Sequence, residues 1–300
     1  MTKACGLYRV RRGKMGTMAV AETQPEIDVV EMLATALAAR RRAGRAQLIG
    51  IAGPQGSGKS TLAAALATRL QGGVGLRVAV LGLDDLYLPK ATRAALAQQV
   101  HPLLATRGVP GTHDVALGHK LIDALLHGDA PVALPVFDKS RDDRAAEPRI
   151  VDAPVDVLLF EGWCIGARPQ SAAALARPVN ALEAQADPHG IWRRWVNARL
   201  AADYVPLFAK ADALVWLQTP AYATALAWRQ QQEAELRAAT GRGMSMAEVA
   251  DFMAHYERLS RAMRRSLPRR ADYVVSIDRA HRLTGLKTKG LRRAGLRPAP

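Results

Sequence analysis

The chain has 300 residues, of which 49% are hydrophobic and 23% are charged, which is typical of a globular protein and excludes disorder as its main character. It contains no run of about 18 apolar residues, and no apolar segment of roughly 7–15 residues follows its basic N-terminus, so we expect neither a membrane-spanning helix nor a secretory signal. The formal net charge of +15 raises the question of a nucleic-acid partner.

Most of the excess positive charge lies at the two ends of the chain. Residues 1–18 hold five Lys or Arg and residues 279–300 hold seven, with no acidic residue in either, so only +3 remains for the segment between them. We interpret residues 1–18 and 284–300 as solvated basic tails of a domain at 19–283, and we expect no nucleic-acid partner. Cys5 and Cys164 lack a CxxC spacing, which argues against a disulfide framework or a zinc site and fits a cytoplasmic protein.

Five short apolar runs, each bounded by Gly, Pro or charged residues, alternate with helical patterns along the chain. We predict strands at 47–52, 77–84, 155–160, 213–218 and 273–277. Strands that alternate with crossover helices form a parallel sheet covered on both faces. The predicted fold class is therefore α/β, a three-layer sandwich with a mostly parallel central sheet of about five strands. No repeat or Ser/Gly-rich linker interrupts it, so we expect one domain.

Helix signals follow the first and fourth predicted strands. After Gly58, leucines recur every fourth residue from Leu62 to Leu70, and Gly72-Gly73 is expected to end that helix. Thr219-Pro220 predicts a capped helix start for a helix that runs through Trp228.

A further helix is predicted to begin at Ser245, because Glu248 three residues later completes a capping box ahead of one apolar face. Two connections between predicted strands are much longer than a crossover helix needs, at 85–154 and 161–212. Segments of this length usually carry binding function, so we predict a helical lid or insertion region.

Residues 53–61 fit the pattern G-x-x-x-x-G-K-[ST] between a predicted strand and a predicted helix. Glycines let successive backbone N–H groups point into one concavity, and the helix N-terminus adds partial positive charge, so this P-loop predicts a phosphate site. We expect Lys59 to reach the β- and γ-phosphates of ATP and Ser60 to bind Mg²⁺. The predicted nucleotide-binding residues are Gly53, Pro54, Gln55, Gly56, Ser57, Gly58, Lys59, Ser60 and Thr61.

Two groups of carboxylates follow predicted strands, at the sheet edge where α/β proteins bind ligands. Asp84 and Asp85 end the second strand, and we expect only one of them to meet the phosphates because side chains alternate along a strand. Glu161 ends the third strand, where it could hold a magnesium water. Arg229, on the helix after the fourth strand, is a candidate lid cation for the transferred phosphoryl group.

Six segments together resemble the D-glycerate 3-kinases of plants and fungi, in the phosphoribulokinase, uridine kinase and pantothenate kinase branch of P-loop kinases. They are Gly53 to Thr61, Leu83 to Leu88, Arg107 to Asp114, Pro135 to Ser140, Phe160 to Trp163 and Trp228 to Gln231. The resemblance implies ATP-dependent phosphorylation of the 3-hydroxyl of D-glycerate, a small-molecule substrate, with Mg²⁺.

The resemblance also implies roles for single residues. Asp84 corresponds to the general base, Glu161 to the acid near magnesium and Arg229 to the lid arginine, while Leu86 replaces the aromatic residue usual in the branch. Because glycerate and ATP are both anionic, the acceptor needs cations or hydrogen-bond donors around it. The implied substrate residues are Asp85, Tyr87, Arg107, His113, Asp138, Lys139 and Arg144.

Two other functions remain open at this point. One is the same chemistry on a nucleoside, pantothenate or a sugar phosphate. The other is a nucleotide-binding regulatory protein without catalysis, in which the basic tails contact nucleic acid. The chain lacks the Asn-Lys-x-Asp motif of guanine recognition, which argues against a GTPase switch. Nothing in the sequence indicates an oligomeric state.

Overall fold

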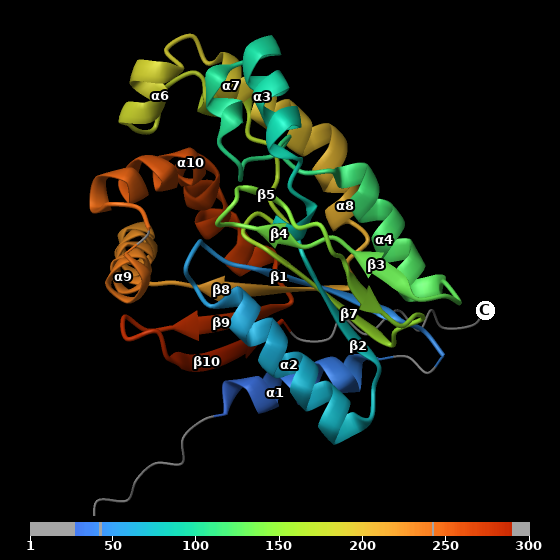
Figure 1. Cartoon of the computed structure of the whole chain (residues 1–300). Helices are drawn as coiled ribbons and strands as arrows, with labels where there is room; N and C mark the ends of the chain where they lie inside the picture. Colours follow the sequence, from blue (N-terminus) through green and yellow to red (C-terminus); the bar gives the residue numbers. More distant parts are fainter. Residues whose placement is uncertain (1–27, 42–43, 242, 290–300) are drawn as a thin grey trace, which may run out of the picture.

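A six-stranded sheet in the order β10-β9-β8-β1-β7-β2 forms the centre of the molecule, in a computed structural model that describes residues 28–41, 44–241 and 243–289 (Figure 1). Five strands are parallel and correspond to the five predicted ones: β1 (Gln47–Ala52), β2 (Val78–Gly82), β7 (Val157–Gly162), β8 (Ala213–Gln218) and β9 (Tyr273–Ile277). The sixth strand, β10 (Leu283–Thr288), pairs antiparallel with β9 at the edge.

Helices cover both faces of the sheet, as the three-layer prediction requires. α1 (Val29–Arg40) and α2 (Lys59–Val74) pack together on one face, while α4 (Val115–His127), α8 (Val205–Phe208) and α10 (Met246–Arg270) lie on the other (Figure 1). Every residue of β1 is buried, and its side chains alternate between two apolar cores. Leu48 and Ala52 enter the core beneath α4 and α10, whereas Ile49 and Ile51 enter the core beneath α1 and α2.

Two of the three predicted helix boundaries differ from the structure. α2 continues through Gly72-Gly73 and ends at Val74, where Gly75 adopts a left-handed conformation with φ +69°. α9 (Tyr222–Thr240) begins after Ala221 without a side-chain cap, so the cap predicted at Thr219 is wrong. The capping box of α10 is confirmed: Ser245 accepts from the backbone N–H of Glu248, whose side chain accepts from the backbone N–H of Ser245.

The first long insertion lies between β2 and β7. Its elements are the 3₁₀ turn η1 (Asp84–Leu86), α3 (Lys90–Gln99), η2 (Pro102–Ala105), α4 and two small sheets that pair β3 (Val132–Leu134) with β6 (Arg149–Val151) and β4 (Phe137–Asp138) with β5 (Asp143–Arg144). Arg93 connects them. Its buried guanidinium donates to the carbonyl oxygens of Leu88, Ala105 and Asp142, and it also pairs with the Asp142 carboxylate.

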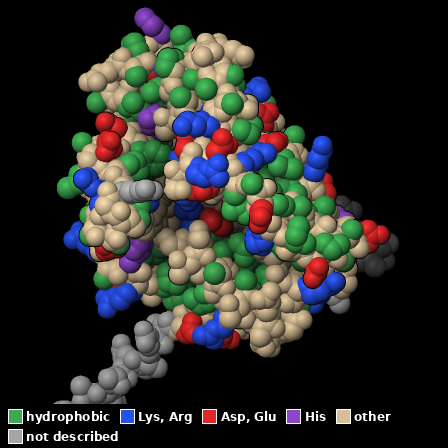
Figure 2. Space-filling model, viewed as in Figure 1, with side chains coloured by type: hydrophobic (Ala, Val, Ile, Leu, Met, Phe, Trp, Pro, Cys, Tyr) green, Lys and Arg blue, Asp and Glu red, His purple; other side chains and the backbone are tan. Residues whose placement is uncertain are grey.

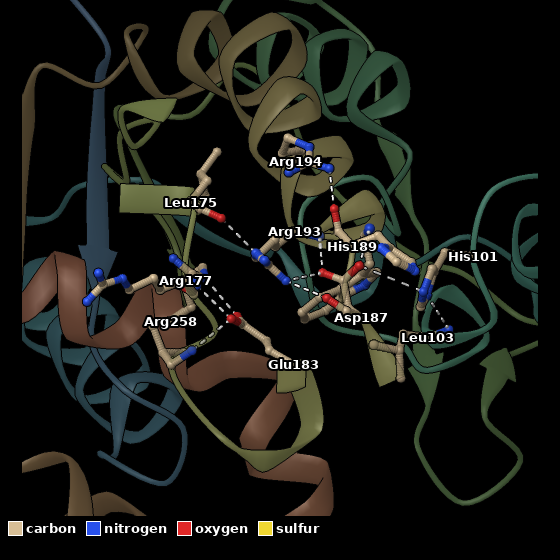
Figure 3. Close-up of polar contacts among 12 residues, drawn as sticks. His101, Leu103, Leu175, Arg177, Glu183, Asp187, His189, Arg193, Arg194 and Arg258 are labelled. Carbon is tan, nitrogen blue, oxygen red and sulfur yellow. Dashed lines mark hydrogen bonds and ion pairs between the residues drawn. The ribbon is translucent and has the colours of Figure 1, made fainter. Parts of the chain in front are cut away.

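The second long insertion lies between β7 and β8. It contains α5 (Ala172–Leu175), α6 (Ala181–Ala186), α7 (Ile191–Arg199), the π-helical turn η3 (Leu200–Tyr204) and α8. Two buried ion pairs hold this insertion together (Figure 3): Arg193 with Asp187 at 3.0 Å, and Arg258 of α10 with Glu183 at 2.6 Å. The insertion is therefore anchored to a long helix that itself packs on the sheet.

Residues near the C-terminal end of the chain extend the sheet further than the sequence indicates. Residues 284–288, assigned above to the basic C-terminal tail, form most of β10. Residues 1–18 and 290–300 lie outside the part of the chain that the structure describes. Among the described residues, no helix combines the length and apolar character needed to cross a membrane.

Candidate active site

The P-loop joins β1 to α2 at the carboxyl end of the central strand. Gly56 and Gly58 have positive φ values of +73° and +81°, which L side chains rarely adopt, so the two glycines are required by the turn itself. Gly53 is needed for space, because a Cβ atom there would lie 2.7 Å from the hydroxyl oxygen of Ser57. The glycine pattern thus folds into the loop that the sequence predicts.

A cleft opens above this loop, where Figure 2 shows a hollow with charged side chains around it. Three cationic side chains and two carboxylates line it among the described residues. Its lining residues are Gln55, Gly56, Gly58, Lys59, Ser60, Thr61, Asp84, Lys139, Glu161, Trp163, Arg229 and Gln232. All four residues expected to be catalytic, Lys59, Asp84, Glu161 and Arg229, therefore meet in one cleft.

Lys59 and Asp84 face each other across the buried side of the cleft. The Lys59 ammonium is 3.0 Å from the carbonyl oxygen of Pro54, and burial lowers its pKa against the opposing effect of Glu161 and Asp84. Burial alone would raise the pKa of Asp84, but the Lys139 ammonium at 2.9 Å holds it below its usual value. Asp84 is thus held ionised, as an acceptor of a proton must be.

Ser60 and Glu161 bring two oxygen ligands to one point. The Ser60 hydroxyl donates to Glu161 Oε1 at 2.7 Å, and burial raises the pKa of Glu161, with Lys59 opposing that rise. Mg²⁺ prefers oxygen ligands and is usually held by one or two carboxylates together with substrate phosphates. A hydroxyl and a carboxylate beside a phosphate-binding loop fit such an ion.

Arg229 lies on α9, which passes close to the P-loop. A Cβ atom at Gly56 would lie 3.6 Å from the backbone nitrogen of Arg229. The Arg229 guanidinium forms an ion pair with Glu233, one turn further along the helix. The helix therefore presents a cation to the cleft and holds it with a buried carboxylate.

Two arginines that the resemblance places at the substrate are engaged outside this cleft. Arg107 forms an ion pair with Asp142. Arg144 donates to the backbone carbonyl of Tyr87 at 3.0 Å and to the Asp114 carboxylate at 3.3 Å. Both therefore hold the first insertion in place, and neither contributes to the lining of the cleft.

Two carboxylates of the predicted substrate set also lie away from the cleft. Asp138 accepts from the backbone N–H and the hydroxyl of Ser140, which stabilises the turn between β4 and β5. Asp85 accepts from the backbone N–H of Phe137 at 3.2 Å, and burial raises its pKa. Asp84 and Asp85 do point apart as predicted, although they do so within a 3₁₀ turn rather than along a strand.

Tyr87 and His113 lie behind Asp84 and are not among the residues that line the cleft. The Tyr87 hydroxyl donates to Asp84 Oδ1 at 2.9 Å, and the imidazole of His113 stacks on the Tyr87 ring with 4.5 Å between ring centroids. Both side chains are buried, and burial lowers the pKa of His113 to about 3 against the opposing charge of Asp84. His113 is therefore a neutral hydrogen-bonding group at neutral pH.

Two lining residues carry no role in the sequence analysis. Trp163 follows Glu161 in the motif that ends β7, and its indole N–H donates to the carbonyl oxygen of Gly108 at 2.8 Å. Gln232 lies three residues after Arg229 on α9. Their proximity in sequence to the two predicted residues is the signal that could have identified them.

Comparison with known proteins agrees with this geometry. The chain is 39% identical over 223 residues to the uncharacterized kinase mug58 of Schizosaccharomyces pombe, which covers 71% of this chain and 79% of that protein. It is 33% identical over 222 residues to the chloroplastic D-glycerate 3-kinase of Arabidopsis thaliana, across 70% of this chain and 46% of that protein. The chain belongs to the P-loop kinase family of the D-glycerate 3-kinases. It is thus a small-molecule kinase, a phosphotransferase with a hydroxyl acceptor.

A solved structure supports this family assignment over the whole fold. The D-glycerate 3-kinase of Cryptococcus neoformans var. grubii superimposes on 88% of this kinase and 100% of its own chain, with 26% identity and a TM-score of 0.73. The family of the methylmalonyl Co-A mutase-associated GTPase MeaB also matches, but only at residues 17–90. That match contains the P-loop, β2 and η1 and ends at Lys90, the first residue of α3, so it leaves out most of the first insertion.

Proposed function

We propose that this kinase transfers the γ-phosphoryl group of ATP to the 3-hydroxyl group of D-glycerate, with Mg²⁺. One observation carries the choice of acceptor: the superposition covers the entire chain of a fungal D-glycerate 3-kinase, so every part of that enzyme has a counterpart here. Because the match covers 88% of this chain, it must include most of the two long insertions, in which small-molecule kinases of different substrates would be expected to differ most.

The P-loop side of the cleft would bind the nucleotide. The backbone N–H groups around Gly56 and Gly58 and the ammonium of Lys59 supply positive charge to the phosphates. Arg229 reaches the same cleft from α9, where it would offset charge that develops on the transferred phosphoryl group. Ser60 and Glu161 would hold Mg²⁺, which when bound would neutralise phosphate charge.

Asp84 would accept the proton of the acceptor hydroxyl. As the bond forms between that oxygen and the γ-phosphorus, the bond from the γ-phosphorus to the bridging oxygen of ADP breaks, and the proton passes to the Asp84 carboxylate. The hydrogen bond from Tyr87 fixes Oδ1 of Asp84, and the substrate hydroxyl would meet Oδ2, the oxygen that pairs with Lys139 at 2.9 Å.

Lys139 is the cation best placed for the acceptor carboxylate. Its ammonium lies 2.9 Å from Asp84 Oδ2 in the same cleft, while about 62% of its side chain is exposed. It is therefore within reach of an anion bound beside Asp84 and free enough to turn toward one. This position suits an acceptor that carries a carboxylate close to its reacting hydroxyl.

The test is a screen of the purified full chain for ADP release with five acceptors: D-glycerate, L-glycerate, uridine, pantothenate and ribulose 5-phosphate. We expect release above background with D-glycerate alone, and NMR of the product should place the new phosphate on the 3-oxygen. Lys59→Met, run in parallel, controls for contaminating kinases. Faster turnover of another acceptor, or release that persists in the Lys59→Met variant, would refute the proposal.

A further inference from the structure

The segment Arg107–Asp114, here termed the acceptor loop, is held from outside by side chains that are distant in sequence. Trp163 donates to the carbonyl oxygen of Gly108, and Tyr256 of α10 donates to that of Arg107 at 3.0 Å. A third anchor is Tyr204, whose hydroxyl oxygen accepts from the backbone N–H of Gly111 at 2.8 Å. The loop therefore has a fixed shape, and His113 lies within it.

Tyr204 also contacts the His113 side chain. Its hydroxyl oxygen lies 2.7 Å from His113 Nδ1, and both side chains are buried, with relative exposures of 0% and 5%. In the part of the chain that the structure describes, Nδ1 is the one partner of this hydroxyl that can accept its proton, because its other partner, Gly111 N–H, is a donor. The Tyr204 O–H therefore donates to Nδ1.

This hydrogen bond decides which nitrogen of His113 carries a proton. A neutral imidazole has one N–H, and a nitrogen that accepts a hydrogen bond cannot carry it. The proton consequently lies on Nε2. That atom is buried and has no hydrogen-bond partner among the described residues. An unsatisfied donor therefore lies beside the Tyr87 ring, whose hydroxyl bonds Asp84, at the border of the cavity next to the cleft.

The backbone at Tyr204 departs from a regular helix. α7 passes into α8 through the π-helical turn Leu200–Tyr204, in which the backbone N–H of Val205 donates to the carbonyl oxygen of Leu200. Such turns add a residue to the helix and so rotate the side chains that follow; they are rare and frequent at functional sites. Here the turn ends on the residue that contacts the acceptor loop.

We propose that Tyr204 is a positioning residue of the kinase reaction, which holds His113 as the Nε2–H tautomer so that this N–H donates a hydrogen bond to the carboxylate of the acceptor beside Asp84. The inference rests on the proposed function for the nature of the acceptor. A neutral donor complements Lys139: the ammonium attracts the acceptor carboxylate by its charge, and the imidazole N–H orients that carboxylate through a directional hydrogen bond. The tautomer itself follows from contacts within the protein.

The first measurement is ¹⁵N NMR of histidine-labelled protein without substrate, with the His113 signal assigned by its loss in His113→Gln. We expect an unprotonated Nδ1 and a protonated Nε2 in the wild type, and a mixture of the two tautomers in Tyr204→Phe. A proton on Nδ1 in the wild type, or an unchanged tautomer in Tyr204→Phe, would overturn the proposal. Because no acceptor is present, this result is independent of whether glycerate is the substrate.

The second measurement is kinetic. Tyr204→Phe should raise KM for D-glycerate roughly tenfold, the loss expected when a hydrogen bond to a charged group is weakened, with little change in KM for ATP. Thr112→Val is the matched control, since it removes a buried hydroxyl in the same loop whose hydrogen bonds go to Gly108 N–H and the Val109 carbonyl rather than to the His113 side chain. Equal rises in KM for the two variants would mean a structural role and would overturn the proposal.

A double-mutant cycle completes the test. His113→Gln supplies an amide N–H that depends on no tautomer, so Tyr204→Phe should add nothing to KM in that background. Additive effects would show that Tyr204 does not act through His113. If the acceptor screen instead identifies a substrate without a carboxylate, the proposed function fails, and so does the carboxylate contact proposed here, whatever the tautomer.

Discussion

Lys59 is the residue with the clearest expected contribution to the reaction. The residue is 9% exposed and its ammonium donates to the carbonyl oxygen of Pro54, so it is already fixed in the loop that would bind the phosphates. Lys59→Met, which keeps the aliphatic stem, should lower kcat by at least about 10²-fold, by analogy with the loss of other preorganised charges. Steady-state ADP release measures this, and an unchanged circular dichroism spectrum and Tm show that the fold persists. Turnover near that of the wild type would exclude the assigned role.

The neighbours Asp84 and Asp85 provide a matched pair of variants. Asp84→Asn should lower kcat roughly 10²- to 10⁴-fold with little change in ATP affinity, because a general base is lost. Asp85→Asn keeps an oxygen that can accept from the Phe137 N–H and should change kcat by less than about tenfold. A larger loss from Asp85→Asn would reverse the assignment of the base.

The ion pair of Asp84 with Lys139 predicts a pH dependence. The ammonium stabilises the ionised carboxylate and holds the pKa of Asp84 below its usual value although burial would raise it. Activity requires the ionised carboxylate, so kcat/KM falls as pH drops through the pKa of Asp84, which gives the acid limb of the pH profile. Lys139→Ala removes the ammonium and should move the Asp84 limb to higher pH, whereas Lys139→Arg should leave it near the wild-type position. Identical acid limbs in all three proteins would contradict the coupling.

Single residues also show where sequence analysis of the site succeeds and where it fails. Lys59 and Glu161 were each expected at the nucleotide site, and both line the same cleft, because motif spacing and the common carboxyl edge of parallel strands fix their positions. Arg107 and Arg144 were expected to face the acceptor, but each meets a carboxylate, Asp142 or Asp114. A charged residue's partner depends on how an insertion folds back on itself, and the spacing along the chain does not specify that.

At the level of elements, one buried ion pair, Arg258 with Glu183, holds the second insertion to α10 (Figure 3). Arg258→Met would leave the Glu183 carboxylate buried without its partner, which should cost about 3–5 kcal/mol of unfolding free energy. Arg261→Ala on the same helix is the control: it breaks an ion pair with Glu257 in which the arginine is half exposed, and should cost about 0.5 kcal/mol or less. Urea unfolding of both variants measures these two losses of unfolding free energy. Similar losses would mean that burial does not distinguish the two pairs.

The success of the element predictions depends on how strongly burial constrains each segment. β1 was predicted to the residue because an apolar run in the middle of a sheet is buried on both faces. The stop expected at Gly72-Gly73 was wrong because a glycine costs a helix only about 1 kcal/mol, and the left-handed Gly75 supplies the actual end. β10 was missed because its side chains are exposed or half-buried, so no apolar run marks it.

At the scale of the whole molecule, the loop at 107–114 is held by side chains from segments far apart in sequence. Trp163 directly follows β7, Tyr204 lies in the π-helical turn and Tyr256 in α10, yet all three bond to the loop at 107–114. Each of these aromatic residues looks like an ordinary core residue in the sequence. Their shared role follows from tertiary folding, since the two long insertions must close over the same edge of the sheet before the contacts exist.

The edge strand gives a prediction about the boundaries of the folded domain. A chain that ends at Leu283 loses most of β10 and leaves the paired edge of β9 without its ladder, so its Tm should fall by more than about 5 °C. A chain that ends at Lys289 keeps all five register pairs between the two strands and should match the full-length protein in Tm and in kcat/KM.

Deletion of residues 1–18 should likewise leave kcat/KM unchanged, because the P-loop and every other motif of the cleft lie after them. Thermal unfolding and ADP-release kinetics of the three shortened chains test these expectations. A tenfold fall in kcat/KM on removal of residues 1–18 or 290–300 would show that a basic end of the chain contributes to the site. An unchanged Tm for the chain that ends at Leu283 would show that β10 adds nothing to the stability of the sheet.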